Sequence, residues 1–310
     1  MKNNILWINN LKIFGILAVI LGHIASPLGS FIYSWHMPLF FILSGFFIKF
    51  NLPIKEFFLK DFQRLMVPYF LFALVGLVME ALKRIALHRD SLDYVHEIKG
   101  IFIWMDMTSL INSYAFVLWF LPTLFFARIF LMVIHKCIEN IVFQFIIVAI
   151  LFTTSFFVEL PFAIDNSLNA ILFLFIGNIF YKSYQEKYIL YSLPFMATAI
   201  YLVYGIPSLD IATKSYNNIV LNIFFSVSVV YIMIAIFKRI NYSNKLLTIW
   251  GGNIMLLFIV HPYTNNIAYI MVEKIHFGDW YLKFFISLAL LQIILWIKQK
   301  FENKGIFRYV

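Results

Sequence analysis

Charged residues are scarce in this chain of 310 residues, since 13% are Asp, Glu, Lys or Arg while 63% are hydrophobic. A soluble domain keeps roughly 25% charged residues, so this chain cannot cover itself with a surface suited to water. Cysteine occurs once, at Cys137, which excludes an internal disulfide and gives no cysteine-based metal site. The composition therefore excludes an ordinary soluble enzyme and a disulfide-stabilised secreted domain.

Long apolar runs are what the chain has instead, each near the length of a bilayer crossing. We expect an all-α, polytopic integral membrane protein, with residues 1–310 forming one membrane-embedded domain. The first run follows Lys2 as in a secretory signal, but it continues almost directly into a second run, so we interpret it as a retained helix. About ten spans fit the pattern: 12–26, 33–50, 65–87, 115–135, 141–160, 167–182, 188–206, 217–237, 248–273 and 280–299. We expect Gly45 to interrupt the second of them.

The distribution of charge predicts the orientation. If the N-terminus is cytoplasmic, most of the 24 Lys and Arg residues fall in cytoplasmic segments, and the other segments are richer in acids. This is the asymmetry of the positive-inside rule, and it predicts that both termini are cytoplasmic. The net charge of +9 thus follows from topology, and no nucleic-acid partner is needed. The longest polar segment, 83–113, falls outside, where we expect an amphipathic helix at the membrane surface.

Two histidines near the outer rim are candidates for catalysis. His23 ends the first predicted span and His36 begins the second, thirteen residues later, so their rings should lie close together. An ionisable group inside a membrane is costly and often functional, although a polar side chain can also serve helix packing. Imidazole exchanges protons near neutral pH. Two imidazoles beside one short turn therefore suggest a base, which would be His23, and an orienting or acid partner, which would be His36.

Three cationic side chains are candidates for binding an anionic ligand. In the stretch KIFGILAVILGH, Lys12 and His23 share one helical face about 16 Å apart along the axis. Lys12 and Arg64 lie at the predicted cytoplasmic ends of their spans, where they serve either as topology anchors or as ligands for phosphates. Arg128 lies deep in the fourth span, where we expect no acid at matching depth, and Glu80 is the alternative partner.

Further polar and aromatic groups have both structural and functional interpretations. Trp119 is placed at the outer interface, where an aromatic belt is common, and His261 lies in the outer half of the ninth span before a proline. Both are candidates for substrate binding. Asn169 and Gly177 are expected to mediate contacts between helices.

Several segments together resemble the integral-membrane acyltransferases of the acyltransferase 3 family, in particular its sugar O-acetylase branch (fucose 4-O-acetylase-like). The matches occur in the family's order and extend over most of the chain. They are the basic-x10-His pattern from Lys12 to His23, HMPLFFILSGF at 36–46, Arg64 with Pro68 and Tyr69, WFL at 119–121, and a late glycine–histidine element from Gly252 to His261. The chain departs from the family at Asn9, where aspartate is frequent, and at Asp61, where a second arginine is common.

The resemblance implies transfer of an acyl group, most often acetyl, from cytoplasmic acyl-CoA to a hydroxyl of a surface glycan or its lipid-linked precursor. It implies a multi-pass protein of the bacterial cytoplasmic membrane, with acyl-CoA as donor substrate and no permanently bound cofactor or metal. On this view His23 is the general base and His36 is its orienting partner. Lys12, Arg64 and Arg128 contact the donor, and Trp119 and His261 contact substrate. Direct transfer and a transient acyl-enzyme both remain open, as does the oligomeric state.

A transporter or exporter of glycan subunits is the alternative function. Broken helices and buried charge suit such a protein as well. Inverted repeats are frequent in transporters, and none is visible here. Release of free CoA from acetyl-CoA by the purified protein distinguishes the two functions, because a transporter would release none.

Overall fold

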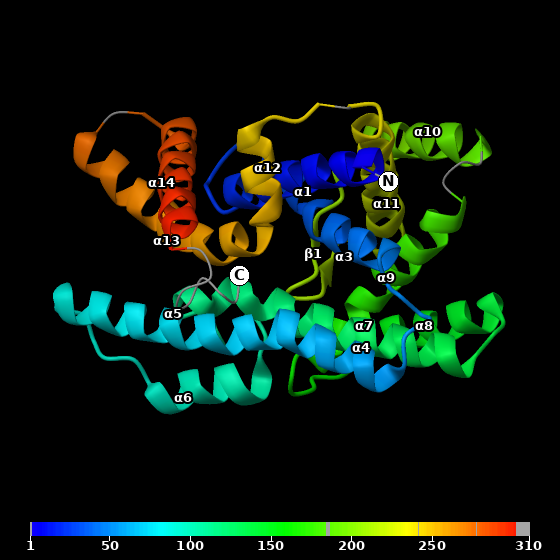
Figure 1. Ribbon diagram of the computed structural model, residues 1–310, viewed down its shortest axis with the longest axis horizontal. Coiled ribbons are helices and arrows are strands. Elements are labelled where there is room, and N and C mark those ends of the chain that lie inside the picture. The colour runs from blue at the N-terminus through cyan, green and yellow to red at the C-terminus, as the bar shows by residue number, and fades with distance from the viewer. Residues whose placement is uncertain (1, 184–186, 241, 277, 302–310) are drawn as a thin grey trace. The chain divides into compact units, whose positions relative to one another are not determined.

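The computed structural model describes residues 2–183, 187–240, 242–276 and 278–301, with side chains described from residue 6 to 180 and from 192 onward within these ranges. The described chain is almost wholly helical apart from one two-stranded sheet (Figure 1). The predicted all-α class is therefore confirmed.

The elements follow one another without a separate soluble domain among the described residues. The first half contains α1 Lys2–Gly22, α2 Gly29–Tyr33, α3 His36–Phe46, α4 Ile54–Asp61, the π-helical turn η1 Phe62–Met66, α5 Val67–Ala86, α6 Tyr94–Lys99, the π-helical turn η2 Gly100–Trp104, the 3₁₀ turn η3 Tyr114–Trp119 and α7 Phe120–Cys137. The second half contains α8 Ile141–Thr154, α9 Ile164–Ser183, α10 Lys187–Tyr204, β1 Leu209–Asp210, β2 Ser215–Tyr216, α11 Ile219–Phe237, α12 Lys245–Gly252, α13 Ile254–Ile275 and α14 Trp280–Lys300.

Within the described residues, nine apolar helical stretches account for the membrane character. Five are long and apolar enough to cross a bilayer: Ile54–Ala86, Tyr114–Cys137, Ile219–Phe237, Ile254–Ile275 and Trp280–Lys300. Four are shorter: Leu6–Gly22, Ile141–Thr154, Ile164–Phe180 and Ser192–Tyr204. The protein is thus a polytopic membrane protein, and the cytoplasmic placement of both termini stays a prediction.

Two of the predicted spans are broken in the structure. The second, 33–50, contains the last residue of α2 and the eleven residues of α3, because a turn at Ser34 and Trp35 separates the two helices and α3 ends at Phe46. The ninth, 248–273, is two helices, α12 and α13, separated at Asn253, whose backbone leaves the helical region with φ −124° and ψ 24°. Apolar content alone hides such breaks, because the residues on both sides of a turn remain hydrophobic.

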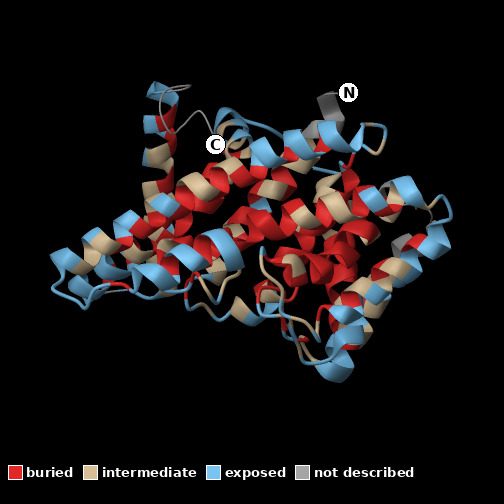
Figure 2. Cartoon of the chain, turned by 90° about the horizontal axis from the view of Figure 1, so that it is seen from below, coloured by how far each residue is buried: buried red, intermediate tan, exposed pale blue. Residues whose placement is uncertain are grey.

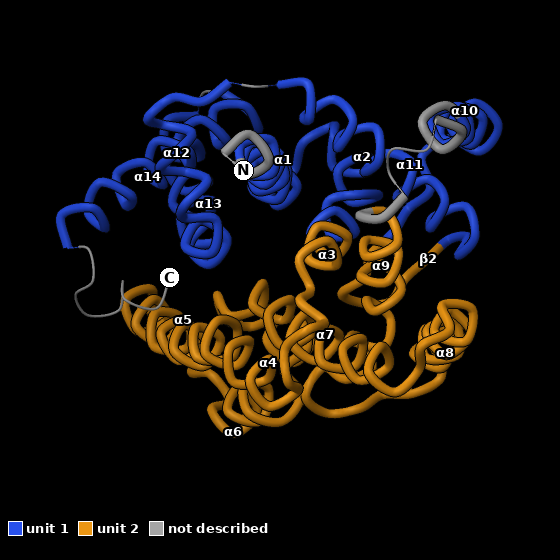
Figure 3. Tube along the Cα trace, turned by 45° about the vertical axis from the view of Figure 1, so that its right-hand side comes forward, with its two compact units in different colours: residues 1–40, 187–209, 217–310 blue, residues 41–186, 210–216 orange. Residues whose placement is uncertain are grey.

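The chain divides into two compact units (Figure 3). Unit 1 contains residues 1–40, 187–209 and 217–310, and unit 2 contains residues 41–186 and 210–216. The division falls inside α3, and each unit combines segments that are distant in sequence.

Unit 1 is organised around α1. This helix packs against α2, α11, α12 and α13, while α13 packs along α14 and α10 along α11 (Figure 1). Polar side chains fasten the packing at several points. Asn10 donates to the main-chain carbonyl of Tyr242 at 2.9 Å, and Trp250 donates to Gln292 at 2.8 Å. Long-range hydrogen bonds of this kind hold apolar helices in one register.

Unit 2 depends on close backbone approach between α3 and α9. A Cβ added to Gly45 would lie 2.1 Å from the carbonyl oxygen of Leu174, and one added to Gly177 would lie 2.1 Å from that of Ile42. Glycine on both sides therefore allows the two backbones to touch. Gly45 does not interrupt α3, and the predicted helix–helix contact at Gly177 is confirmed.

A short hairpin closes one end of α9 in unit 2. Asn166 donates to the carbonyls of Ile211 and Ala212 at 3.1 and 2.9 Å, and Lys214 pairs with Asp165. Asn169, which the sequence placed in a helix contact, accepts from Tyr216 at 2.6 Å and donates to Ser155 at 3.0 Å. These buried polar groups satisfy one another, as they must in an apolar interior.

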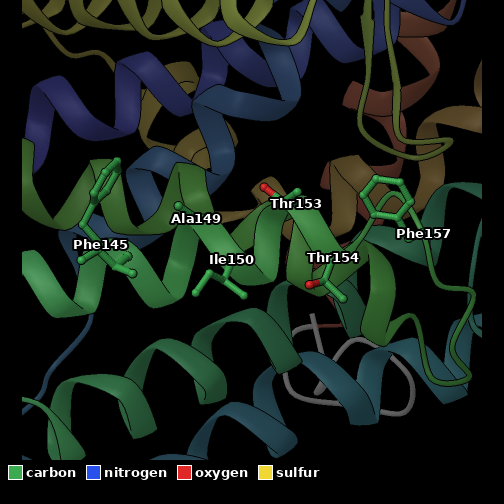
Figure 4. Close-up of a pocket in the computed structure, with 7 residues that line it drawn as sticks. Phe145, Ala149, Ile150, Thr153, Thr154 and Phe157 are labelled. Atoms are coloured by element: carbon green, nitrogen blue, oxygen red, sulfur yellow. The ribbon is translucent and has the colours of Figure 1, made fainter.

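Exposed surfaces of several helices are strongly apolar. Buried residues form stripes on most helices and exposed residues cover the other faces (Figure 2). On α8 an open groove of about 510 Å³ is bounded by Phe145, Ile146, Ala149, Ile150, Thr153, Thr154 and Phe157 (Figure 4). Such a face suits lipid chains. The segment of α6 and η2, within the polar stretch expected to carry a surface helix, also exposes Val95, Ile98 and Phe102.

We predict that Gly45→Ala and Gly177→Ala each destabilise unit 2 by at least the roughly 1–3 kcal/mol typical of overpacking, because each new methyl group meets a backbone carbonyl. Gly29→Ala is the matched control, since no heavy atom lies within 4 Å of its added Cβ. The measurement is the thermal midpoint of the detergent-solubilised protein. A midpoint for Gly45→Ala equal to that of Gly29→Ala would contradict the close approach.

Candidate active site

The first helix carries two of the predicted site residues. Lys12 is half-buried within α1, and His23 follows the last residue of this helix, with its backbone N–H donating to the carbonyl of Val19 at 3.1 Å. The helical path therefore continues from one residue to the other, and their separation of about 16 Å along the axis follows from the helical rise. Both belong to unit 1.

Three imidazoles gather where α1 ends. The ring of His23 lies 5.2 Å from that of His261, centroid to centroid, and 6.3 Å from the ring of Tyr33. The Tyr33 ring in turn contacts His36 at 5.1 Å. His23 is exposed, whereas His36 and His261 are buried. The structure thus brings together both predicted catalytic histidines and a third that the sequence assigned to substrate binding.

Main-chain carbonyls determine which nitrogen carries the proton in the two buried rings. Nδ1 of His36 lies 2.8 Å from the carbonyl oxygen of Ile32, and Nδ1 of His261 lies 2.6 Å from that of Phe258. A carbonyl oxygen only accepts, so Nδ1 donates in both contacts. In a neutral ring the lone pair is then on Nε2.

In the described part of the chain, no group of three or more His, Cys, Asp or Glu side chains could hold a metal ion.

Arg128 has a carboxylate partner in unit 2, so the expectation that no acid lies at its depth is wrong. Its Nε donates to Asp61 at 2.5 Å and its Nη2 to the same carboxylate at 3.4 Å. Nη1 donates to the hydroxyl and carbonyl of Ser44 at 2.9 and 3.3 Å. All three guanidinium nitrogens are engaged, and the ring of Phe57 covers the group at 5.2 Å.

Glu80, the alternative partner, pairs elsewhere. Its carboxylate binds Lys83 and Arg84 on the next turn of α5, and the second of these ion pairs measures 3.1 Å. These spacings are the usual i,i+3 and i,i+4 contacts of a helix surface. The alternative of a pair between Glu80 and Arg128 is therefore excluded by the structure.

Arg64 lies beside the buried ion pair on the π-helical turn η1. It contacts Asp61 at 3.2 Å, yet 56% of its side chain is exposed against 6% for Asp61. Turns of this kind displace side chains from the ideal helical pattern and occur often at functional sites. Pro68 lies in the first turn of α5, but the helix does not begin there, because it continues from α4 through η1.

Two aromatic residues from the sequence pattern are structural in this arrangement. Trp119 is buried at the end of η3 and packs edge-on against Phe120 at 6.4 Å. Tyr69 is fully buried and donates to the carbonyl of Ile101 at 2.9 Å, which ties α5 to η2. A role for Trp119 in substrate binding stays a prediction.

Asp61 and Tyr33 are the residues whose positions sequence reasoning missed. Asp61 is separated from Arg128 by 67 residues, and no local pattern connects them. A signal was nevertheless present, because the resemblance expects an arginine at position 61 and an acid there reverses the charge. Tyr33 had no signal, since one more aromatic residue among 17 tyrosines draws no attention.

The ion pair predicts an asymmetric response to mutation. Asp61→Leu should destabilise the protein by about 3–5 kcal/mol, the cost of breaking a buried pair, because guanidinium cannot shed its charge. Arg128→Met should cost less, since Arg64 still contacts Asp61. The double variant Asp61→Leu/Arg128→Met should recover stability, as judged by the thermal midpoint in detergent. Recovery of Arg128→Met by Glu80→Gln instead would contradict the observed pairing.

Comparison with known families gives one assignment. The family model of the acyltransferase domain known as acyltransferase 3 matches residues 5–299, nearly the whole chain and all the histidines described above. No curated protein and no solved structure matches the chain. The chain belongs to the acyltransferase 3 family and is a membrane acyltransferase.

Proposed function

We propose that the protein is an O-acyltransferase that moves an acyl group, most simply acetyl, from cytoplasmic acyl-CoA to a hydroxyl of a surface glycan or its lipid-linked precursor. The observation that carries the proposal is the exposed imidazole of His23 at the end of the helix that holds Lys12. One helix thereby offers a base at one end and a cation about 16 Å away along its axis. The bacterial cytoplasmic membrane is the proposed location.

A long, flexible donor fits this separation. CoA places its phosphates at one end and its thioester at the other, joined by an extended pantetheine arm. Lys12 would neutralise phosphate charge, and Arg64, exposed on η1, would offer its planar fork to a phosphate group. Arg128 is already engaged with Asp61 and Ser44. Its proposed contribution to donor binding is therefore indirect, through the carboxylate that also contacts Arg64.

The proposed reaction begins with removal of the acceptor proton by His23. The hydroxyl oxygen attacks the thioester carbonyl carbon, a C–O bond forms and the C–S bond breaks. The proton on His23 then passes to the departing CoA thiolate, so that the products are the ester and free CoA. His36 contributes through the ring of Tyr33, which contacts the rings of both His36 and His23. A transient acyl-enzyme would use the same base and the same leaving group.

His23→Ala should reduce acyl transfer by about 10²–10⁴-fold, the usual contribution of a general base, with normal insertion and folding. His96→Ala is the matched control, because His96 is exposed on α6. Two measurements apply: free CoA released from acetyl-CoA by purified protein, and acetylated surface glycan detected by mass spectrometry. A wild-type protein that never releases CoA would favour the exporter, and full activity in His23→Ala would remove His23 from the reaction.

Lys12→Ala and Arg64→Ala should raise KM for acetyl-CoA about 10–100-fold each, corresponding to loss of a charged hydrogen bond, while KM for the acceptor is unchanged. Lys99→Ala, which removes an exposed cation on α6, controls for general charge. The assay is CoA release at varied acetyl-CoA. A rise confined to the acceptor KM would show that these cations do not bind the donor.

A further inference from the structure

The imidazole of His261 has a buried acceptor atom that receives no hydrogen bond from the described residues. The residue is 0% exposed, and its Nδ1 proton is held by the carbonyl of Phe258 at 2.6 Å. Its Nε2 is buried and has no hydrogen-bond partner among the residues that the structure describes. A buried polar atom left unmatched costs about 1–3 kcal/mol, so it needs an explanation.

The imidazole of the proposed base lies against the ring of His261. The two rings are 5.2 Å apart between centroids, with planes inclined by 36°. His23 is exposed and sits in the turn after α1, and a ring N–H of His23 directed at Nε2 of His261 would give this atom a partner. Hydrogen bonds of catalytic groups are often long in the unliganded state and tighten when substrate binds.

The surrounding hydrogen bonds hold the two histidines in register. Asn265, one turn after His261 on α13, donates to the carbonyl of Ile20 at 3.0 Å, three residues before His23. That carbonyl lies in the last turn of α1, where helical acceptors are otherwise unused. Ser287 on α14 donates to Asn265 at 2.6 Å, so hydrogen bonds through Asn265 join α1, α13 and α14.

A second contact restrains the turn of α13 that carries His261. Thr264 donates to the carbonyl of His261 at 3.1 Å and is 2.8 Å from the hydroxyl of Ser287. Both ring nitrogens of His261 are therefore held in place. Nδ1 is fixed by its hydrogen bond within α13, and Nε2 is fixed by the position of α13 against α1. A preorganised acceptor of this kind is what a base partner requires.

Other buried polar atoms also lack partners among the described residues, for example Trp35 Nε1, Thr123 Oγ1 and Ser228 Oγ. His261 differs from these because a titratable ring of the proposed mechanism lies against it. His36, which the sequence assigned as the orienting residue, has its ring against Tyr33. The unmatched Nε2 beside the ring of His23 makes His261 the candidate for a direct hydrogen bond to the base.

We propose that His261 is a positioning residue for acyl transfer: its Nε2 accepts the N–H of His23 and holds the other ring nitrogen of His23 toward the acceptor hydroxyl. This role rests on the proposed function of His23. The acceptor proton moves to His23 and then to the CoA thiolate, while His261 keeps its Nδ1 proton and exchanges none. The hydrogen bond also stabilises the imidazolium that His23 becomes during the reaction.

Two variants of similar size separate the two ring nitrogens. In His261→Asn the amide nitrogen can replace Nδ1 and keep the bond to Phe258, but nothing replaces Nε2. In His261→Gln the longer side chain places an amide oxygen near the position of Nε2. We expect kcat for acetyl-CoA-dependent transfer to fall about 100-fold in His261→Asn, the effect of a misplaced reacting group, with KM for acetyl-CoA unchanged. His261→Gln should recover most of that loss.

A double variant shows whether the effect passes through His23. If His261 acts only by positioning His23, His23→Ala/His261→Asn should be no slower than His23→Ala alone. Additive losses, a wild-type kcat in His261→Asn, or equal loss in the Asn and Gln variants with both monodisperse would each overturn the proposal. Full activity in His23→Ala is a different failure, because it removes the base itself and with it the proposed function.

A measurement on the wild-type protein covers variants that do not fold. With ring-¹⁵N-labelled histidine and a non-hydrolysable thioether analogue of acetyl-CoA, NMR should detect an N–H···N bond between two histidines, one of which keeps its proton on Nδ1. The signal should be absent in His23→Ala. Absence of such a bond from the wild-type complex would overturn the proposal.

Discussion

Polar groups inside this protein must find their partners within the chain, because lipid offers none. The buried pair of Arg128 and Asp61 is the clearest case, since neither charge could remain in an apolar interior alone. The Asn265–Ser287–Thr264 network in unit 1 and the Asn166–Lys214 contacts in unit 2 satisfy the same requirement with neutral or paired groups. Against this background, an exposed imidazole beside a buried unmatched one is an exception located at the proposed reaction centre.

Sequence reasoning reached the fold class and the neighbourhood of the site for a physical reason. Helices of a membrane protein are continuous apolar runs, and a charged or imidazole side chain within such a run is rare enough to be noticed. His23 and His36 could be placed together because only a short turn separates their helices. His261 could be noticed but not located, since its contact with His23 spans more than two hundred residues.

The failures have equally specific causes. Asp61 lies outside all the predicted spans, whereas in the structure a continuous helix from α4 through η1 to α5 carries it into the interior of unit 2. Hydropathy could not detect the break at Asn253, because the sequence on both sides remains apolar. Gly45 looked like an interruption of a helix, but its lack of a side chain serves contact with α9. Each of these features depends on contacts with residues that are distant in the sequence.

The interleaved composition of unit 1 has a consequence for biosynthesis. Its first helix is made at the start of translation, yet the groups that hold it, at Tyr242, Asn265 and Ser287, are made near the end. Contacts of such long sequence separation form late and slowly. The nascent chain must therefore carry α1 in the membrane without its final neighbours while unit 2 is synthesised. A ribosome that stops before α13 leaves an inserted protein whose proposed base lacks the imidazole of His261 beside it, so completion of the chain itself controls when the reaction centre is assembled.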